Sequence, residues 1–389
     1  MREQSPEKEV IMEQMKDLNI EQFWIDDEIA HRDNCFAGEA PQVALGIRMT
    51  HECFKDELGV ELNPWAPNPP ELMREYASRY NDKAEKIVGK RLVPEEYPFR
   101  RAVFPRIKRI GEFFGGRYFY KYDTEYLEGS ITTFKELEKL LDDVEKIDAR
   151  DFAFPPDWDS KVKEAYEKTG QKPEPRDYGR QVRGPCTLAA SIIGTENFMY
   201  LWYDEPELLR RFSQIMGDTI INLNKAIDSA CGYNEQNKPH GFSFADDNCC
   251  LTTPEFYETF GFPILKRIFD YWCPDENDHR YQHSDSDMAH LLPVLSRLNF
   301  TGVNFGPNVL FDEIRKYMPK ARIDGCIAPF TFMRNQTEEL FAQAKRDCQM
   351  AINSGTKGLN LSTAGSVNPG SSLESLRLVM QVIQNFGRY

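Results

Sequence analysis

Hydrophobic and polar positions alternate in a regular order of short strands and longer helices from about residue 100 onward. Apolar residues three or four positions apart, such as Phe134, Leu137 and Leu141, predict amphipathic helices. Short apolar or alternating runs between the helices predict strands at 101–104, 117–122, 241–245, 280–283, 301–305, 322–326 and 358–361. Because helical segments separate most of these runs, the pattern predicts a parallel sheet.

Capping signals mark where several of these helices begin. Thr133-Phe-Lys-Glu136, Thr252-Thr-Pro-Glu255 and Ser371-Ser-Leu-Glu374 each place Glu three residues after Thr or Ser, which is the capping-box pattern. Pro206 suits the first turn of a helix that we expect to run to about Ile227. The helix starts therefore support the same strand-and-helix order.

The first part of the chain is less regular. Helical patterns at Glu7–Leu18 and Pro70–Val88 are separated by a Pro-rich stretch at 63–70, and residues 150–178 have the composition of a loop or insertion. We expect residues 1–95 to form an N-terminal extension that is part of the same domain as residues 96–389.

The length of 389 residues and the strand–helix order predict an α/β fold, a (β/α)8 TIM barrel with an N-terminal helical extension. No G-x-G-x-x-G follows the first predicted strand and no G-x-x-x-x-G-K-[ST] occurs. The sequence therefore disfavours dinucleotide-binding and P-loop folds.

Composition narrows the functional classes. The chain has 48 Lys and Arg against 62 Asp and Glu, a net charge of −14, which argues against binding to nucleic acid or an anionic membrane. There is no signal-peptide pattern and no apolar run of about 18 residues, so we expect a cytoplasmic protein that does not span a membrane. Nine cysteines without a C-x-x-C pair indicate reduced thiols rather than a zinc ribbon.

Polar residues collect after the predicted strands, where the active site of such a barrel lies. The candidate catalytic residues are Asp246, Asp247 and His283. The candidate metal ligands are His283, Asp285 and Asp247. The candidate substrate-binding residues are Arg183, Asn248, Asn308, Asp324 and Ser362. Carboxylates and an imidazole can bind a divalent metal or transfer protons. Alternatively, the acids cap helices and the histidine is packed.

Several motifs, in order, resemble the uroporphyrinogen decarboxylase superfamily over about residues 180–387. They are Arg183-Gly-Pro-Cys-Thr-Leu-Ala, Ile193-Gly-Thr-Glu-Asn, Tyr203-Asp-Glu-Pro-Glu-Leu-Leu, Asp246-Asp, Thr253-Pro-Glu-Phe, Phe262-Pro-Ile-Leu-Lys, His283 with Leu291-Leu-Pro-Val-Leu, and Leu361-Ser-Thr-Ala-Gly-Ser-Val-Asn-Pro-Gly. The resemblance implies a (β/α)8 barrel. It also implies one of two activities, cofactor-free decarboxylation of a porphyrinogen or methyl transfer to or from a corrinoid.

The resemblance favours the methyltransferase branch. The decarboxylase segment R-Q-A-G-R is absent, Gly46-Ile-Arg48-Met being the nearest match, and a polyanionic porphyrinogen suits a chain of charge −14 poorly. The zinc methyltransferases use His-x-Cys and a late Cys, and here His283 is kept while Asp285 and Ala364 replace the thiols. Such a harder site suits activation of oxygen or nitrogen better than of sulfur.

The sequence therefore predicts a demethylase component that moves a methyl group from a methoxylated or N-methylated small molecule to a corrinoid (cobalamin) carried by a separate protein, with Zn²⁺ as an optional cofactor and a possible homodimer. The first alternative is a cofactor-free uroporphyrinogen-type decarboxylase, in which Asp246 or Asp247 binds pyrrole N–H groups. The second is a non-catalytic barrel that acts as a binding partner.

Overall fold

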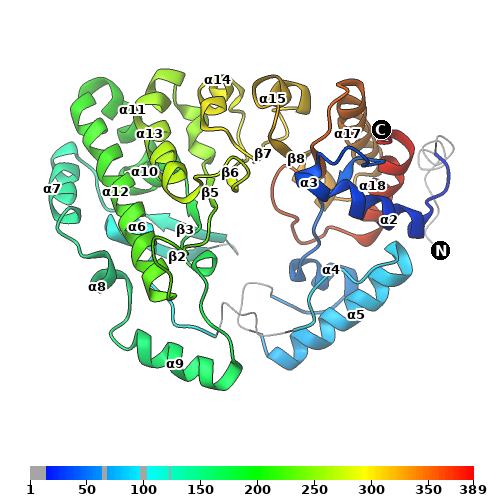
Figure 1. Cartoon of the computed structure of the whole chain (residues 1–389), viewed down its shortest axis with the longest axis horizontal. Helices are drawn as coiled ribbons and strands as arrows, with labels where there is room; N and C mark the ends of the chain where they lie inside the picture. Colours follow the sequence, from blue (N-terminus) through cyan, green and yellow to red (C-terminus); the bar gives the residue numbers. More distant parts are fainter. Residues whose placement is uncertain (1–14, 64–67, 97–102, 122–123) are drawn as a thin grey trace. The chain divides into compact units, whose positions relative to one another are not determined.

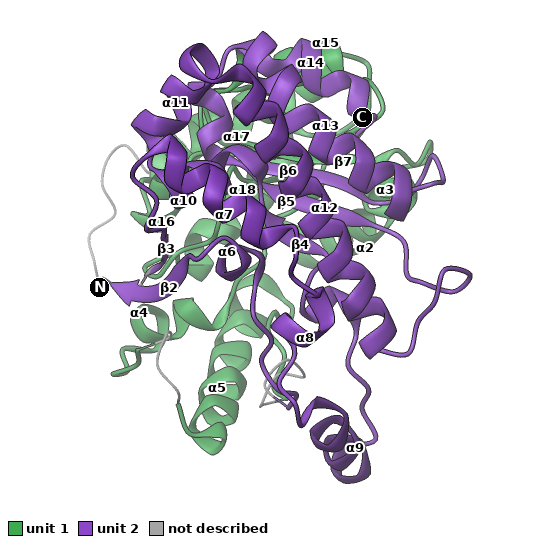
Figure 2. Ribbon diagram, turned by 90° about the vertical axis from the view of Figure 1, so that its left-hand side faces the viewer, with its two compact units in different colours: residues 1–97, 284–289, 302–389 green, residues 98–283, 290–301 purple. Residues whose placement is uncertain are grey.

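The structure is a computed structural model that describes residues 15–63, 68–96, 103–121 and 124–389. The chain forms two compact units, the first comprising residues 1–97, 284–289 and 302–389 and the second comprising residues 98–283 and 290–301 (Figure 2). Helices and strands alternate along much of both units (Figure 1). Among the described residues, no helix is both long and apolar enough to cross a bilayer.

The second unit is built on three parallel strands in the order β4 (Gln181–Arg183), β5 (Phe242–Ala245) and β6 (Arg280–Ser284). Its helices are α6 (Ile110–Phe113), α7 (Phe134–Val144), α8 (Ala149–Ala153), α9 (Trp158–Thr169), η3 (Pro175–Asp177), α10 (Pro185–Ile193), α11 (Thr195–Asp204), α12 (Pro206–Ala230), η4 (Asp247–Leu251) and α13 (Pro254–Trp272). Short turns η5 (Ala289–Leu291), α14 (Leu292–Leu295) and η6 (Ser296–Leu298) follow β6.

Aromatic packing sets the orientation of β5. The Phe242 ring centroid lies 5.5 Å from that of Trp272, and the Phe244 centroid lies 5.6 Å from that of Phe269, so both side chains face α13. Because side chains alternate along a strand, Ser243 and Ala245 face the opposite side of the sheet. The register pairs Ala245 with Arg183 of β4 and with His283 of β6, which places those two side chains on that same opposite face.

The first unit contains four parallel strands in the order β1 (Ala44–Leu45), β9 (Leu359–Thr363), β8 (Arg322–Ile327) and β7 (Gly302–Phe305). Its helices are α2 (Ile20–Ala30), α3 (Arg32–Cys35), η1 (His51–Cys53), α4 (Phe54–Leu58), α5 (Pro70–Val88), α15 (Phe311–Tyr317), α16 (Pro329–Met333), α17 (Thr337–Asn353) and α18 (Leu373–Phe386).

The N-terminal segment is tied to the C-terminal helix within the first unit. The Asn19 amide donates to Gln384 Oε1 at 2.8 Å, and Gln381 Nε2 donates to the Lys16 carbonyl at 3.0 Å. The Arg388 guanidinium is paired with the buried Asp26 carboxylate. The described part of the N-terminal extension is therefore integrated into a compact unit, and the proposed boundary at residue 95 stays a prediction.

One predicted strand forms but does not join the parallel sheet, and another is not a strand where it is described. Arg117–Lys121 (β2) pairs in antiparallel register with Thr124–Glu128 (β3), since a connection of two residues is far too short for a parallel crossover. Residues 103–104 form a turn and a bend, and residues 101–102 lie outside the described residues. The sequence reading also missed β1, β3 and β4, of which β1 and β4 have only two and three residues, too few to show a period.

Helix predictions were more accurate in type than in position. Helix α5 spans the predicted Pro70–Val88, but α8 and α9 occupy much of the stretch 150–178 that was expected to be a loop. Of the predicted helix Glu7–Leu18, residues 7–14 lie outside the described residues and residues 15–18 are not helical.

The predicted capping positions are partly correct. Thr133 and Glu136 form the predicted capping box. In the other two motifs the second hydroxyl residue caps the helix instead of the first: Thr253 caps α13 and Ser372 caps α18.

A buried ion pair links β4 to the helices of the second unit. The Arg180 guanidinium is paired with Asp228, whose second carboxylate oxygen accepts from Trp272 Nε1 at 3.0 Å. Burial lowers the pKa of Arg180 and raises that of Asp228, so desolvation opposes both charges.

We expect Asp228→Ala to lower the free energy of unfolding by about 3–5 kcal/mol, because it leaves a buried guanidinium without its counter-charge. Urea denaturation measures the change. Glu207→Ala, which removes an exposed partner of Arg210, is the control and should change stability by less than about 0.5 kcal/mol. A similarly small loss for Asp228→Ala would contradict the prediction.

Candidate functional site

The segment that follows β5 is fixed by a carboxylate bound to a helix. Asp246 is fully buried, and its carboxylate oxygen Oδ1 accepts from the Thr187 backbone amide at 2.8 Å and from the Thr187 hydroxyl at 2.9 Å. The Cys186 amide lies 3.4 Å from Oδ2. These donors belong to the first turn of α10, where unpaired amides and the helix dipole favour a negative charge. Asp246 therefore caps the helix that follows β4.

Glycine is required where β4 meets this carboxylate. A Cβ atom on Gly184 would lie 2.2 Å from Asp246 Cβ and 2.8 Å from its Cα, so a side chain there would displace the loop. The Gly184 amide also donates to the Ala245 carbonyl at 2.7 Å. The motif Arg183-Gly-Pro-Cys-Thr thus has a physical reason: it brings α10 against the end of β5.

Thr187 also binds Asn248, the residue that follows Asp246 and Asp247. Its hydroxyl oxygen accepts from the Asn248 amide at 2.9 Å while donating to Asp246. The Cys249 thiol donates to the Asp246 carbonyl at 2.8 Å. The sequence reading did not select Thr187, although it lies inside a motif that the family resemblance had marked.

The adjacent acid has a different environment. Asp247 is half-buried, and one of its carboxylate oxygens lies within 4.8 Å of an imidazole nitrogen of the half-buried His283. The backbone fixes their relative position, since the Asp246 amide donates to the His283 carbonyl at 2.9 Å. The structure therefore separates the two acids by role, with Asp246 bound to α10 and Asp247 beside the histidine.

The remaining predicted residue of this unit is Arg183. Its side chain is half-buried on the same face of the sheet as His283, and Nη1 lies 3.4 Å from the Ser191 hydroxyl. Arg183, Asp247, Asn248 and His283 thus all lie at or just beyond the carboxyl ends of three adjacent parallel strands. An imidazole, a carboxylate and a guanidinium in one place can transfer a proton, hold a cation or bind an anionic substrate group.

The other predicted residues lie in the first unit. The exposed Asp285 packs against the turn after β9: a Cβ on Gly365 would lie 2.7 Å from Asp285 Oδ1. Ala364, the other position at which the family resemblance implied a thiol, directly precedes Gly365 in the chain.

Asn308, Ser362 and Asp324 lie on or after other strands of the first unit. Asn308 is exposed after β7, whereas Ser362 is buried within β9 and its hydroxyl donates to the Thr363 carbonyl at 3.1 Å. Asp324 lies in the middle of β8, and its carboxylate accepts from Arg322 at 2.7 and 2.8 Å and from Asn360 at 2.8 Å. That carboxylate is already fully engaged, which the sequence pattern did not indicate.

Comparison with known proteins identifies the family. The model of the uroporphyrinogen decarboxylase (URO-D) family matches residues 142–386, and the chain belongs to this family. The fold of that family is a (β/α)8 barrel, so the predicted fold class is confirmed, although the described strands in parallel pairs number seven rather than eight. No curated protein sequence matches the chain.

One solved structure shares this fold, and a second is less similar. A methyltransferase from Methanosarcina mazei has 17% identity and a TM-score of 0.53, with 88% of this chain and 93% of that chain covered. A B12-independent methionine synthase from Shewanella sp. W3-18-1, in complex with selenomethionine, has 12% identity and a TM-score of 0.40, with 88% and 94% covered.

Burial gives the Asp246 carboxyl a measurable pH signature. Its pKa is raised to about 6 by burial, against the opposing effect of the hydrogen bonds from Thr187 and Cys186. In the unfolded chain an Asp carboxyl has a pKa of about 3.9. Between these values the folded protein binds more protons than the unfolded chain, so this group lowers the free energy of unfolding as the pH rises from about 4 to about 6.

The Asn side chain of Asp246→Asn cannot ionise. As the pH rises from about 4 to about 7, we expect the free energy of unfolding of this variant to rise by about 2–3 kcal/mol relative to that of the wild type. Urea denaturation of both proteins across this range measures the difference. Asn248→Ala is the control, since it removes no ionisable group and should change stability equally at each pH. A pH-independent difference for Asp246→Asn would contradict the prediction.

Proposed function

We propose that this chain transfers a methyl group from a methoxylated or N-methylated small molecule to a corrinoid held by a separate protein. The observation that carries the proposal is that the Asp247 carboxylate lies within 4.8 Å of the His283 imidazole, at the carboxyl ends of β5 and β6. Active sites of this fold class lie at that end of the strands. The shared fold with a protein named as a methyltransferase supports the same reaction class.

In this proposal His283 supplies a proton to the leaving oxygen or nitrogen of the substrate. An alkoxide is a poor leaving group at neutral pH, so protonation is what makes an ether methyl group transferable. Asp247 stabilises the protonated imidazole, because an opposite charge within 4.8 Å favours the charged form. A reduced corrinoid, when bound, would accept the methyl group.

The same residues fit a metal ion by the chemistry of their donors. Asp247 and His283 offer one oxygen and one nitrogen ligand within 4.8 Å, and Asp285, two residues further along the chain, stays a predicted third ligand. Oxygen and imidazole ligands suit Zn²⁺ and related divalent ions. A cation there would supply Lewis-acid polarisation of the substrate's oxygen or nitrogen.

Arg183 is proposed to anchor an anionic group of the substrate, since it lies on the same face of the sheet as His283. A planar guanidinium binds carboxylate or phosphate through two parallel hydrogen bonds. Asn248 follows Asp247 directly and is proposed to contact the same substrate. Asp324 stays a predicted substrate contact, and its carboxylate binds Arg322 and Asn360.

The decarboxylase alternative is supported by the name of the matching family. It assigns pyrrole N–H binding to Asp246 or Asp247. The contacts favour Asp247 for that role, since the Asp246 carboxylate is buried against α10. The two functions therefore predict the same residue at the site but differ in the need for a corrinoid protein.

We expect the purified protein to demethylate at least one member of a panel of methoxylated and N-methylated compounds when a reduced corrinoid protein is present, measured by the absorbance of the corrinoid. His283→Ala should lower kcat/KM by about 10²–10⁴-fold, because it removes the proton donor. His279→Ala is the matched control and should leave kcat/KM unchanged, as His279 precedes β6 at its opposite end.

Conversion of uroporphyrinogen to coproporphyrinogen without a metal or a corrinoid would contradict methyl transfer and establish the decarboxylase. Folded protein that turns over neither substrate class would indicate the non-catalytic binding partner.

A further inference from the structure

A second group of side chains of the types that ligate metals lies at the amino ends of β5 and β6, within the second unit. His240 comes two residues before β5, and Asp275 and Asp278 belong to the turn before β6. His240 Nδ1 lies 3.1 Å from Asp278 Oδ2 and 3.5 Å from Asp275 Oδ2. One ligand atom from each of the three residues lies within 4.8 Å of the others.

The backbone holds the two acids in place. The Asp275 amide donates to Asp278 Oδ2 at 2.8 Å, and the Asp278 amide donates to the Asp275 carbonyl at 3.1 Å. The Arg280 guanidinium donates to the Asp275 carbonyl at 2.8 Å, and the Thr301 hydroxyl donates to the Asp278 carbonyl at 3.0 Å. The ligand positions are therefore set before any ion binds, which lowers the entropic cost of binding.

The two separations from His240 match those of a zinc-type site. Bonds of about 2.0–2.1 Å to imidazole nitrogen and carboxylate oxygen in a tetrahedral site place neighbouring ligand atoms about 3.3 Å apart. The measured separations from His240 Nδ1, 3.1 and 3.5 Å, lie on either side of that value. The same distances would also suit a histidine hydrogen-bonded to the two acids, so the experiment must distinguish an ion from a proton.

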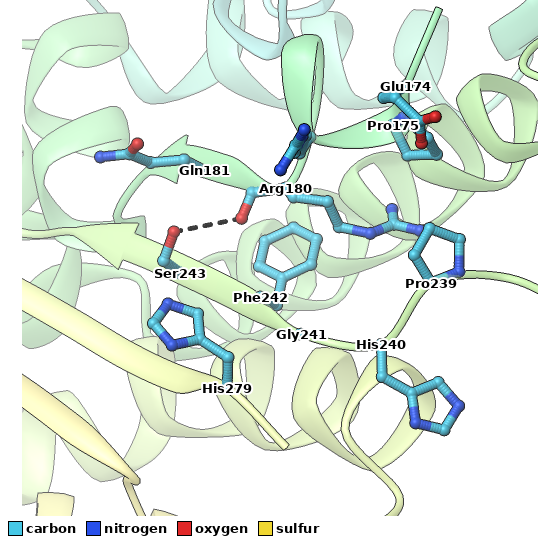
Figure 3. Close-up of a pocket in the computed structure, with 11 residues that line it drawn as sticks. Glu174, Pro175, Arg180, Gln181, Pro239, His240, Gly241, Phe242, Ser243 and His279 are labelled. Carbon is cyan, nitrogen blue, oxygen red and sulfur yellow. Dashed lines mark hydrogen bonds between the residues drawn. The ribbon is translucent and has the colours of Figure 1, made fainter. Parts of the chain in front are cut away.

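A cavity adjoins this group of side chains at His240. His240 lines a cavity of about 580 Å³ together with Arg176, Arg180, Ser243 and His279 (Figure 3). The His240 side chain is 40% exposed, so this ligand group can be reached from solvent.

We infer that His240, Asp275 and Asp278 form a divalent-cation site of the zinc class at the rim of this cavity. Three protein ligands leave at least one coordination position open, and the cavity offers room for a water molecule or an anionic ligand there. The site is separate from the Asp247–His283 pair, because the four residues of β5 span about 13 Å between them.

The test measures Zn²⁺ binding to the folded full-length chain by isothermal titration calorimetry, and Co²⁺ binding by visible absorption. His283→Ala provides the background, since it removes the imidazole ligand of the proposed catalytic site. In this background we expect about one zinc ion per chain. Adding His240→Ala should abolish that ion, and adding the exposed Asp275→Asn should weaken its binding without unfolding the chain.

His279→Ala, placed in the same background, is the control: His279 lines the same cavity but lies outside the three-residue group, so zinc binding should be unchanged. The inference is wrong if His283→Ala binds no zinc, or if the ion survives His240→Ala. Equal loss in the His279→Ala control would also overturn it. None of these outcomes depends on methyl transfer, so the inference and the proposed function can fail independently.

Discussion

The contact between the Asp246 carboxylate and the first turn of α10 is the constraint on which the candidate site depends. Amides and a hydroxyl replace part of the water that this fully buried carboxylate loses, and so offset part of the cost of burying its charge. The contact joins the end of β5 to the helix after β4, and Gly184 provides the space for it. Because Asp246 is fixed in this way, the next residue, Asp247, lies beside His283.

The alternation of side chains along β5 is the second determinant. Phe242 and Phe244 pack against α13, so the residues between and after them face the other side of the sheet. Parallel register then brings Arg183 and His283 to that face on the neighbouring strands. The two ends of the same strands differ in chemistry: one carries Asp247 and His283, whereas the other carries His240 and the cavity beside Arg180.

Much of this arrangement could be predicted from local pattern. The strands β5 to β9 and helices such as α5, α7 and α12 follow from apolar periodicity and capping residues, because both signals are local. The motifs around Arg183, Asp246 and His283 identified the family. The hairpin β2–β3 was misjudged because an alternating run predicts a strand but does not indicate its partner.

The sequence by itself determined the fold class, the order of strands and helices, and the strand ends at which polar residues gather. The tertiary structure decided which of those residues are available for chemistry. Asp246 and Asp247 are adjacent and chemically identical, yet one is buried by α10 and the other lies beside His283. Asp324 likewise binds Arg322 and Asn360. The physical reason is that burial and hydrogen-bond partners come from segments distant in the chain, about which local pattern carries no information.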